Sequence, residues 1–199
     1  MALPPLGVVL AAGGSTRLGQ PKALVEVNGR SLVSLAVNQL IQSGCHPVYI
    51  VTRFDLLLAV MAEAPSALVV VNHRPELGRT RSLQLALKAA YSERGRWPRR
   101  AVVAPVDRPG WRPEVVRRLL EAPSSSTPVH GGRGGHPVTL DQDAMHAVVG
   151  APGDAPLNAV VSFERVPVHG PWFALNIDTP DDVEHLTDSA RALKDYMDE

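Results

Sequence analysis

Apolar runs and helical patterns alternate along the first 120 residues. Four runs rich in Val, Ile, Leu and Ala predict buried strands at 6–10, 48–52, 68–71 and 101–104. Apolar residues spaced three and four apart predict a helix after each run, at 32–43, 54–62, 83–90 and 113–120. This repeated order predicts an α/β fold, with a mostly parallel sheet, right-handed crossovers and helices on both faces.

The rest of the chain has fewer regular patterns. Residues 72–81 and 122–128 are predicted to be loops, and 172–177 a further strand. Ser31 is predicted to cap the helix at 32–43, and Thr179 to cap a C-terminal helix, with Asp182 completing a capping box. There is no internal repeat and no segment of linker length, so we expect one domain over residues 1–199.

Composition excludes several classes of protein. Of 199 residues, 45% are hydrophobic, and 20 basic residues balance 20 acidic ones. This balance gives no general affinity for nucleic acid or an anionic membrane, and no apolar run reaches the length of a membrane span. The N-terminus lacks a secretory pattern, so we expect a cytoplasmic protein. The one cysteine, Cys45, excludes an internal disulfide and is expected to pack as a small apolar residue.

The loop after the first strand has the features of a phosphate site. Gly13 and Gly14 allow backbone N–H groups to approach a ligand closely, and Arg17 and Lys22 add two positive charges. The loop is not a P-loop, because Gln20 and Pro21 separate Gly19 from the lysine. A strand that enters such a loop suits a polyphosphate, although the residues alone also allow an ordinary turn with solvated cations.

Two aspartates are candidate ligands of a divalent cation. Asp107 follows the strand at 101–104 and lies between Pro105 and Pro109. It suits Mg²⁺, which prefers one or two carboxylates plus phosphate oxygens, but an aspartate beside proline more commonly bonds to its own backbone in a turn. Asp178 precedes the predicted cap and is not needed for it, which leaves its carboxylate free for a metal.

Two further loops carry candidate residues. The segment 131–138 has four glycines beside Arg133 and could be a flexible loop or a hinge that closes over a substrate. His136 in it could equally serve as a structural hydrogen-bonding group. The loop at 72–81 is cationic, and is either solvated or in contact with a ligand.

These segments together resemble the MobA-like nucleotidyltransferases. Residues 10–22 are similar to the family signature L-A-A-G-x-S-x-R-(M/L)-G-x-x-K, and Asp107 aligns with its D-x-P. Residues 176–182 resemble D/N-I-D-T-P-x-D, residues 132–137 resemble G-x-x-G-H-P, and residues 72–82 resemble an N-…-G-…-S segment. The resemblance implies a Rossmann-like, three-layer nucleotide-diphospho-sugar transferase fold.

The resemblance also implies roles for individual residues. Catalytic roles fall to Arg17, Lys22 and Asp107, and Asp107 and Asp178 would hold Mg²⁺. The acceptor would contact Arg133, Gly135, His136 and Pro137. The implied nucleotide-binding residues are Leu10, Ala11, Ala12, Gly13, Gly14, Ser15, Arg17, Lys22, Asn72, Gly78 and Ser82.

The implied reaction is that of a molybdenum cofactor cytidylyltransferase-type enzyme. It would move CMP from CTP to a phosphate-bearing acceptor, molybdopterin by resemblance, and release pyrophosphate. CTP is favoured over GTP because Gln20-Pro21 precedes Lys22, although Arg108 stands where cytidylyltransferases usually have Gln. The alternatives are a sugar- or polyol-phosphate nucleotidyltransferase and a non-catalytic maturation factor for a molybdoenzyme.

Overall fold

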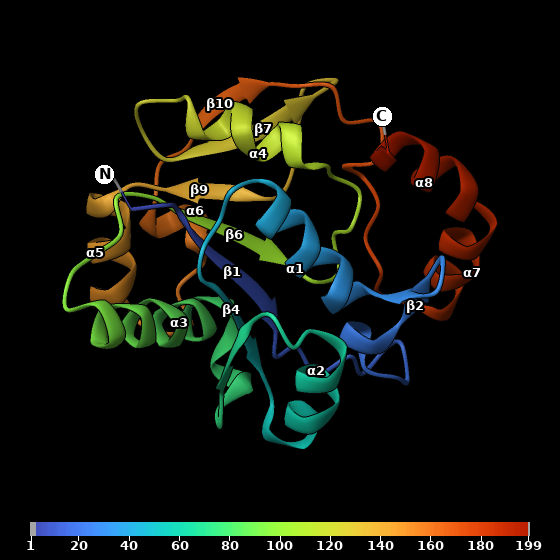
Figure 1. Ribbon diagram of the computed structural model, residues 1–199, viewed down its shortest axis with the longest axis horizontal. Helices are drawn as coiled ribbons and strands as arrows, with labels where there is room; N and C mark the ends of the chain where they lie inside the picture. The colour runs from blue at the N-terminus through green and yellow to red at the C-terminus, as the bar shows by residue number, and fades with distance from the viewer. Residues whose placement is uncertain (1–2, 199) are drawn as a thin grey trace.

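A twisted sheet crosses the centre of the molecule in the computed structural model, which describes residues 3–198 (Figure 1). Its eight strands follow the order β10-β7-β9-β6-β1-β4-β5, with β8 paired to β7. Strands β5, β4, β1 and β6 are parallel, while β9 runs antiparallel between β6 and β7. The bounds are β1 Leu6–Ala11, β4 Val48–Thr52, β5 Leu68–Val71, β6 Ala101–Pro105, β7 Ser126–His130, β8 Arg133–Gly134, β9 Val138–Leu140 and β10 Glu164–Pro167.

Helices cover both faces of this sheet, which gives the three-layer α/β sandwich that the sequence predicts. One buried cluster joins the sheet to α1, α2, α4, α7 and α8, and a second joins it to α3, α5 and α6. Alternate residues of β1 enter the two clusters, as a strand buried on both faces requires. The bounds are α1 Leu32–Gln42, α2 Leu57–Glu63, α3 Gly78–Arg94, α4 Pro113–Leu120, α5 Gln142–Gly150, α6 Leu157–Val160, α7 Pro180–Asp188 and α8 Ala190–Asp198.

Short elements complete the fold. A two-stranded hairpin of β2, Glu26–Val27, and β3, Arg30–Ser31, precedes α1. Single 3₁₀ turns are found at Lys22–Leu24, Phe54–Leu56 and Pro75–Leu77. No helix in the described part of the chain is long and apolar enough to cross a membrane.

The predicted helix caps are confirmed. The Oγ of Ser31 accepts a hydrogen bond from the N–H of Ser34 at the start of α1. Thr179 and Asp182 form the reciprocal capping box of α7. These local signals hold because each depends only on residues a few positions apart.

Several predicted bounds are wrong in the first half of the chain. The β5 strand, predicted to be buried, is an edge strand, and Leu68 is 43% exposed. The predicted helix at 54–62 is a 3₁₀ turn followed by α2. The loop predicted at 72–81 is shorter, because α3 begins at Gly78 and so includes the basic residues that follow.

The second half differs more. The loop predicted at 122–128 ends where β7 begins, at the fully buried Ser126. Residues 172–174 form a turn and 175–177 are irregular instead of a strand, although Phe173 and Ile177 are buried as their apolar character requires. The single C-terminal helix is broken at Ser189 into α7 and α8. The apolar character of these residues predicted that they are buried, but formation of a strand also requires a neighbouring strand with which to pair.

Candidate functional site

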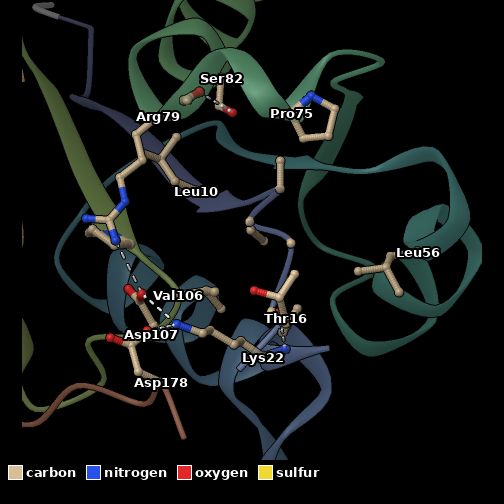
Figure 2. Close-up of a pocket in the computed structure, with 18 of the residues that line it drawn as sticks. Leu10, Thr16, Lys22, Leu56, Pro75, Arg79, Ser82, Val106, Asp107 and Asp178 are labelled. Carbon is tan, nitrogen blue, oxygen red and sulfur yellow. Dashed lines mark hydrogen bonds and ion pairs between the residues drawn. The ribbon is translucent and has the colours of Figure 1, made fainter. Parts of the chain in front are cut away.

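A cleft opens beyond the carboxyl ends of β1 and β6, where ligands bind in open α/β sheets (Figure 2). The loop between β1 and Lys22 forms one wall, and the start of α3 forms another. The segment that leads into α7 supplies Asp178. The residues that line the cleft are Leu10, Ala11, Ala12, Gly13, Gly14, Ser15, Thr16, Arg17, Lys22, Ala23, Leu56, Pro75, Gly78, Arg79, Ser82, Pro105, Val106, Asp107 and Asp178.

The loop between β1 and Lys22, here called the glycine loop, is fixed by hydrogen bonds within it. Ser15 has a left-handed backbone (φ 51°), and its Oγ accepts a hydrogen bond from the N–H of Lys22 at 3.1 Å. Among residues 3–198, the N–H groups of Gly13, Gly14 and Thr16 have no protein acceptor. Unpaired N–H groups that line a cleft form a site for an anion.

The protein's own packing does not explain glycine at position 13. Its φ is not left-handed, and a Cβ built there would meet no atom within 4 Å. Conformation and internal contacts would therefore both allow alanine. A ligand that lies directly on the backbone would not allow it, because the methyl group would occupy the ligand's space.

Lys22 joins two carboxylates that are far apart in the sequence. Its Nζ donates to Oδ2 of Asp107 at 3.2 Å and also to Oδ1 of Asp178 (Figure 2). The side chains are mostly enclosed, with 14% of Lys22, 9% of Asp107 and 23% of Asp178 exposed. The structure thus brings both predicted aspartates to one point opposite the glycine loop.

Two arginines extend this cluster into solvent. Arg17 pairs with Oδ2 of Asp178 at 3.2 Å, and Arg79 reaches Oδ2 of Asp107 at 3.5 Å. Figure 2 shows the Arg79 side chain extending from α3 toward Asp107. The hydrogen bond from Lys22 lowers the pKa of Asp178, with further contributions from the Asn176 amide and from the charge of Arg17. Asp178 is therefore ionised at neutral pH.

The two carboxylates fit a small divalent cation whose remaining coordination positions are filled by substrate oxygens and water. In the described ranges, no group of three or more His, Cys, Asp or Glu side chains is placed to hold a metal ion. Two carboxylates that meet at one cation suit Mg²⁺, which keeps several waters and shares phosphate oxygens with its substrate. The ammonium group of Lys22 neutralises the two carboxylates in this structure.

The predicted residues at 72–82 divide into two groups. Gly78 and Ser82 line the cleft, whereas Asn72 is not among its lining residues. Asn72 is 1% exposed and donates to Oγ of Ser82 at 3.0 Å. Its side-chain oxygen accepts from the N–H of Arg74, so Asn72 holds the entry to α3 in place.

The predicted acceptor residues lie along two adjoining cavities. Gly135 and His136 line a second cavity beside the cleft, which also contains Arg108. Arg133 lines an adjoining basic pocket, which shares Arg108 and Gly134 with this cavity, and Pro137 is buried and lines neither. Burial and, to a smaller extent, the positive charges of Arg108 and Arg79 together lower the pKa of His136 to about 4. The imidazole is therefore neutral at physiological pH.

Arg79 and Asn176 were not among the candidates from the sequence. Arg79 faces Asp107 only because α3 begins early, at Gly78. Asn176 orients Asp178 by donating to its Oδ2. Its position two residues before the candidate aspartate was the available signal.

Comparison with known proteins gives a consistent family. Residues 7–168 match the MobA-like NTP transferase domain. The nicotine blue oxidoreductase of Paenarthrobacter nicotinovorans is 35% identical over 162 residues, which cover 75% of this chain and 77% of that protein. A probable molybdenum cofactor guanylyltransferase of Opitutus terrae is 36% identical over 91 residues, or 46% of this chain and 43% of that protein.

Solved structures show the same architecture. Rv0371c from Mycobacterium tuberculosis H37Rv superposes with a TM-score of 0.81 at 25% identity, covering 95% of this chain and 100% of that one. A manganese complex of Rv0371c superposes with a TM-score of 0.76 at 22% identity, covering 94% of this chain and 100% of that one. The fold is that of the nucleotidyltransferases, as predicted.

Proposed function

Because the chain belongs to the MobA-like NTP transferase family, we propose that it transfers a nucleoside monophosphate from an NTP to a phosphate-bearing acceptor. CTP is the proposed donor, and molybdopterin is the proposed acceptor. The observation that carries this proposal is the meeting of Lys22, Asp107 and Asp178 opposite the unpaired N–H groups of the glycine loop. A carrier protein would need no such cluster.

The glycine loop would bind the triphosphate. The N–H groups of Gly13, Gly14 and Thr16 would donate to phosphate oxygens, and Arg17 would stabilise charge on the leaving pyrophosphate. Lys22 would turn from the aspartates to the α-phosphate. A preorganised charge of this kind contributes about 3–4 kcal/mol to transition-state stabilisation, by analogy with oxyanion donors.

Asp107 and Asp178 would hold the divalent cation, proposed to be Mg²⁺. When bound, such an ion neutralises charge that develops on the α-phosphate. Asp182 fixes the backbone N–H of Asp178 at 2.9 Å, and Asn176 fixes its carboxylate. The backbone of Asp107 is fixed to the same segment, because its carbonyl accepts a hydrogen bond from the N–H of Ile177 at 3.0 Å. The chain thus presents both carboxylates in set positions.

The reaction needs no covalent enzyme intermediate. An oxygen of the acceptor phosphate would attack the α-phosphorus and form a new P–O bond. The bond between the α-phosphorus and the oxygen that bridges to the β-phosphate would break, so pyrophosphate leaves with that electron pair. Positioning and charge neutralisation supply most of the catalysis in such transfers.

The acceptor would enter from the cavity that contains Gly135 and His136. This cavity shares Leu10, Arg79 and Pro105 with the nucleotide cleft. An acceptor phosphate there would lie beside Asp107 and so beside the α-phosphate. The neutral imidazole of His136 would donate or accept a hydrogen bond and would carry no charge.

The test is pyrophosphate release by the purified protein with Mg²⁺ or Mn²⁺, each of the four NTPs, and molybdopterin. We expect release with CTP, a cytidylylated acceptor by mass spectrometry, and its loss in Asp107→Asn. Tighter binding and faster turnover of GTP would overturn the choice of base, and the guanylyltransferase relatives make GTP the sharpest comparison. Transfer to a sugar or polyol phosphate would replace the acceptor.

A second candidate is an oxidoreductase, because the relative that matches three-quarters of the chain is named nicotine blue oxidoreductase. Such a reaction needs an electron donor, so the same preparation is tested for oxidation of NADH and NADPH. Oxidation without pyrophosphate release would favour this candidate. Nucleotide binding with neither reaction would favour a maturation factor for a molybdoenzyme.

A further inference from the structure

A second cavity adjoins the nucleotide cleft and has its own character. The two spaces share Leu10, Arg79 and Pro105, so a ligand in one can reach a ligand in the other. The floor of the second cavity is apolar, and includes Leu83, Val103, Val138, Leu157 and Phe163. An apolar floor of this kind suits the face of a ring.

The rim of this cavity is basic. Arg79, Arg108 and Arg165 line it, together with a single acidic side chain, Asp154. Arg79 pairs with Asp107 at 3.5 Å, and Arg165 donates to the carbonyl of Gly132 at 2.7 Å. Three positively charged guanidinium groups therefore line this cavity together with only one carboxylate. A ligand with more than one negative charge would restore the balance.

Two residues that line this cavity each bury one polar atom that has no protein partner in the described part of the chain. Nε of Arg108 and Nδ1 of His136 are both inaccessible to water and make no hydrogen bond among residues 3–198. Burial of an unpaired polar atom costs about 1–3 kcal/mol, so native structures usually satisfy such atoms. Both residues line the same cavity, which points to a polar ligand there.

Arg108 is directed away from the nucleotide. Asp107 lines the nucleotide cleft, while the next residue lines the second cavity and the adjoining basic pocket of His130 and Arg133. The cytidylyltransferases that the sequence resembles usually have Gln at this position. An arginine adds a fixed charge and a planar fork that can bind two oxygens of one phosphate.

We propose that Arg108 makes the second cavity selective for a dianionic phosphate monoester carried on a ring, which lies on the apolar floor. This proposal deepens the proposed function, on which it rests, by naming the residue that selects the acceptor's phosphate. Arg108 binds the phosphate oxygens that do not react, and Arg79 stands between that phosphate and Asp107. A neutral hydroxyl acceptor leaves the guanidinium charge of Arg108 without an ion-pair partner among residues 3–198, whereas Arg79 keeps its pair with Asp107.

The experiment uses phenyl phosphate as the probe, with phenol and inorganic phosphate as its two halves. Binding is measured by calorimetry on the whole protein, with α,β-methylene CTP and Mg²⁺ present to fill the nucleotide site. We expect phenyl phosphate to bind at least tenfold more tightly than either half. In Arg108→Gln that binding falls at least tenfold, whereas the affinity for α,β-methylene CTP stays within twofold.

Three further variants complete the test. Arg108→Lys keeps the charge without the fork, and we expect an intermediate affinity. Arg96→Gln is the matched control, since this exposed arginine follows the far end of α3, which is roughly 25 Å long at 1.5 Å per residue. Arg165→Gln provides a second probe of the same rim if Arg108→Gln does not fold.

Unchanged phenyl phosphate binding in Arg108→Gln would overturn the proposal, as would displacement of the probe by α,β-methylene CTP. Failure of the proposed function looks different. In that case pyrophosphate is never released by the unaltered protein, but phenyl phosphate still binds and still depends on Arg108.

Discussion

Replacement of Lys22 by Met should destabilise the free protein and make it respond to metal. The ammonium group neutralises Asp107 and Asp178, which are 9% and 23% exposed, and the substitution would leave the two carboxylates facing each other. Loss of one partner from a buried ion pair costs about 3–5 kcal/mol. Because Asp178 is partly solvated, we expect about 3 kcal/mol, or a fall in Tm of about 6–12 °C for a chain of this length.

A divalent cation should restore what the lysine supplied. At a hundred times its Kd, a ligand that binds only the folded state stabilises it by about 2.7 kcal/mol. In the unaltered protein Lys22 competes with the metal for the same oxygens, so Mn²⁺ without nucleotide should raise Tm much less. In Lys22→Met the same addition should recover most of the lost stability.

The assay is thermal melting with and without MnCl₂, in the absence of nucleotide. Lys88→Met is the control, since Lys88 is exposed on α3 and the removal of its charge should change neither Tm nor the metal response. The reasoning is refuted if Lys22→Met melts like the unaltered protein, or if Mn²⁺ shifts both by the same amount. Turnover should fall separately by about 10²–10³-fold, the usual loss of one preorganised charge.

Three further predictions concern the glycine loop, His136 and the segment that carries Asp178. Gly13→Ala should leave the free energy of unfolding in urea within about 0.5 kcal/mol of that of the unaltered protein, since a Cβ there meets no other atom. Calorimetry should nevertheless show at least tenfold weaker MgCTP binding. Equal binding would show that the ligand does not lie on this loop. The pKa of His136 is lowered to about 4 by burial and by two arginines, so the unfolded state binds the proton first. Stability should therefore fall as pH drops from about 6.5 to 4, by up to about 3 kcal/mol, and His136→Gln should lose that part of the pH dependence in urea titrations. Gly110→Ala places a Cβ 2.1 Å from the carbonyl oxygen of Trp172 and should lower the free energy of unfolding by about 3 kcal/mol. Mn²⁺ binding should also weaken, because Asp178 follows the segment that contains Trp172. An unchanged Tm would show that this segment moves aside without cost.

The sequence predicted the parts of the fold that depend on neighbouring residues. The strand at 48–52 and the caps at Ser31 and Thr179 are where periodicity and cap chemistry placed them. Patterns failed where a distant partner decides the conformation. Residues 172–177 are apolar enough for a strand, but no strand in the described part of the chain pairs with them, and Trp172 packs close against Gly110. They form a turn at 172–174 and an irregular segment at 175–177.

The candidate site followed the same division. The sequence identified the glycine loop, the two aspartates and the lysine, because each has a chemical character that is recognisable from its own neighbours. It could not show that Lys22 bonds to both aspartates, since those contacts join segments brought together by separate strands. Nor could it show that Arg108 lines the same cavity as His136, while Arg133 lines the adjoining pocket.

What the sequence by itself determined is therefore most of the strands and helices in the first 120 residues, their order and the kind of chemistry the chain can hold. Hydrophobic period and cap residues act over a few positions, so they can be read without a fold. Only the tertiary structure decided which charges meet, which of them are buried and which line separate cavities. The physical reason is that these properties depend on the lateral order of the strands and on the packing of loops against one another, which no local pattern contains.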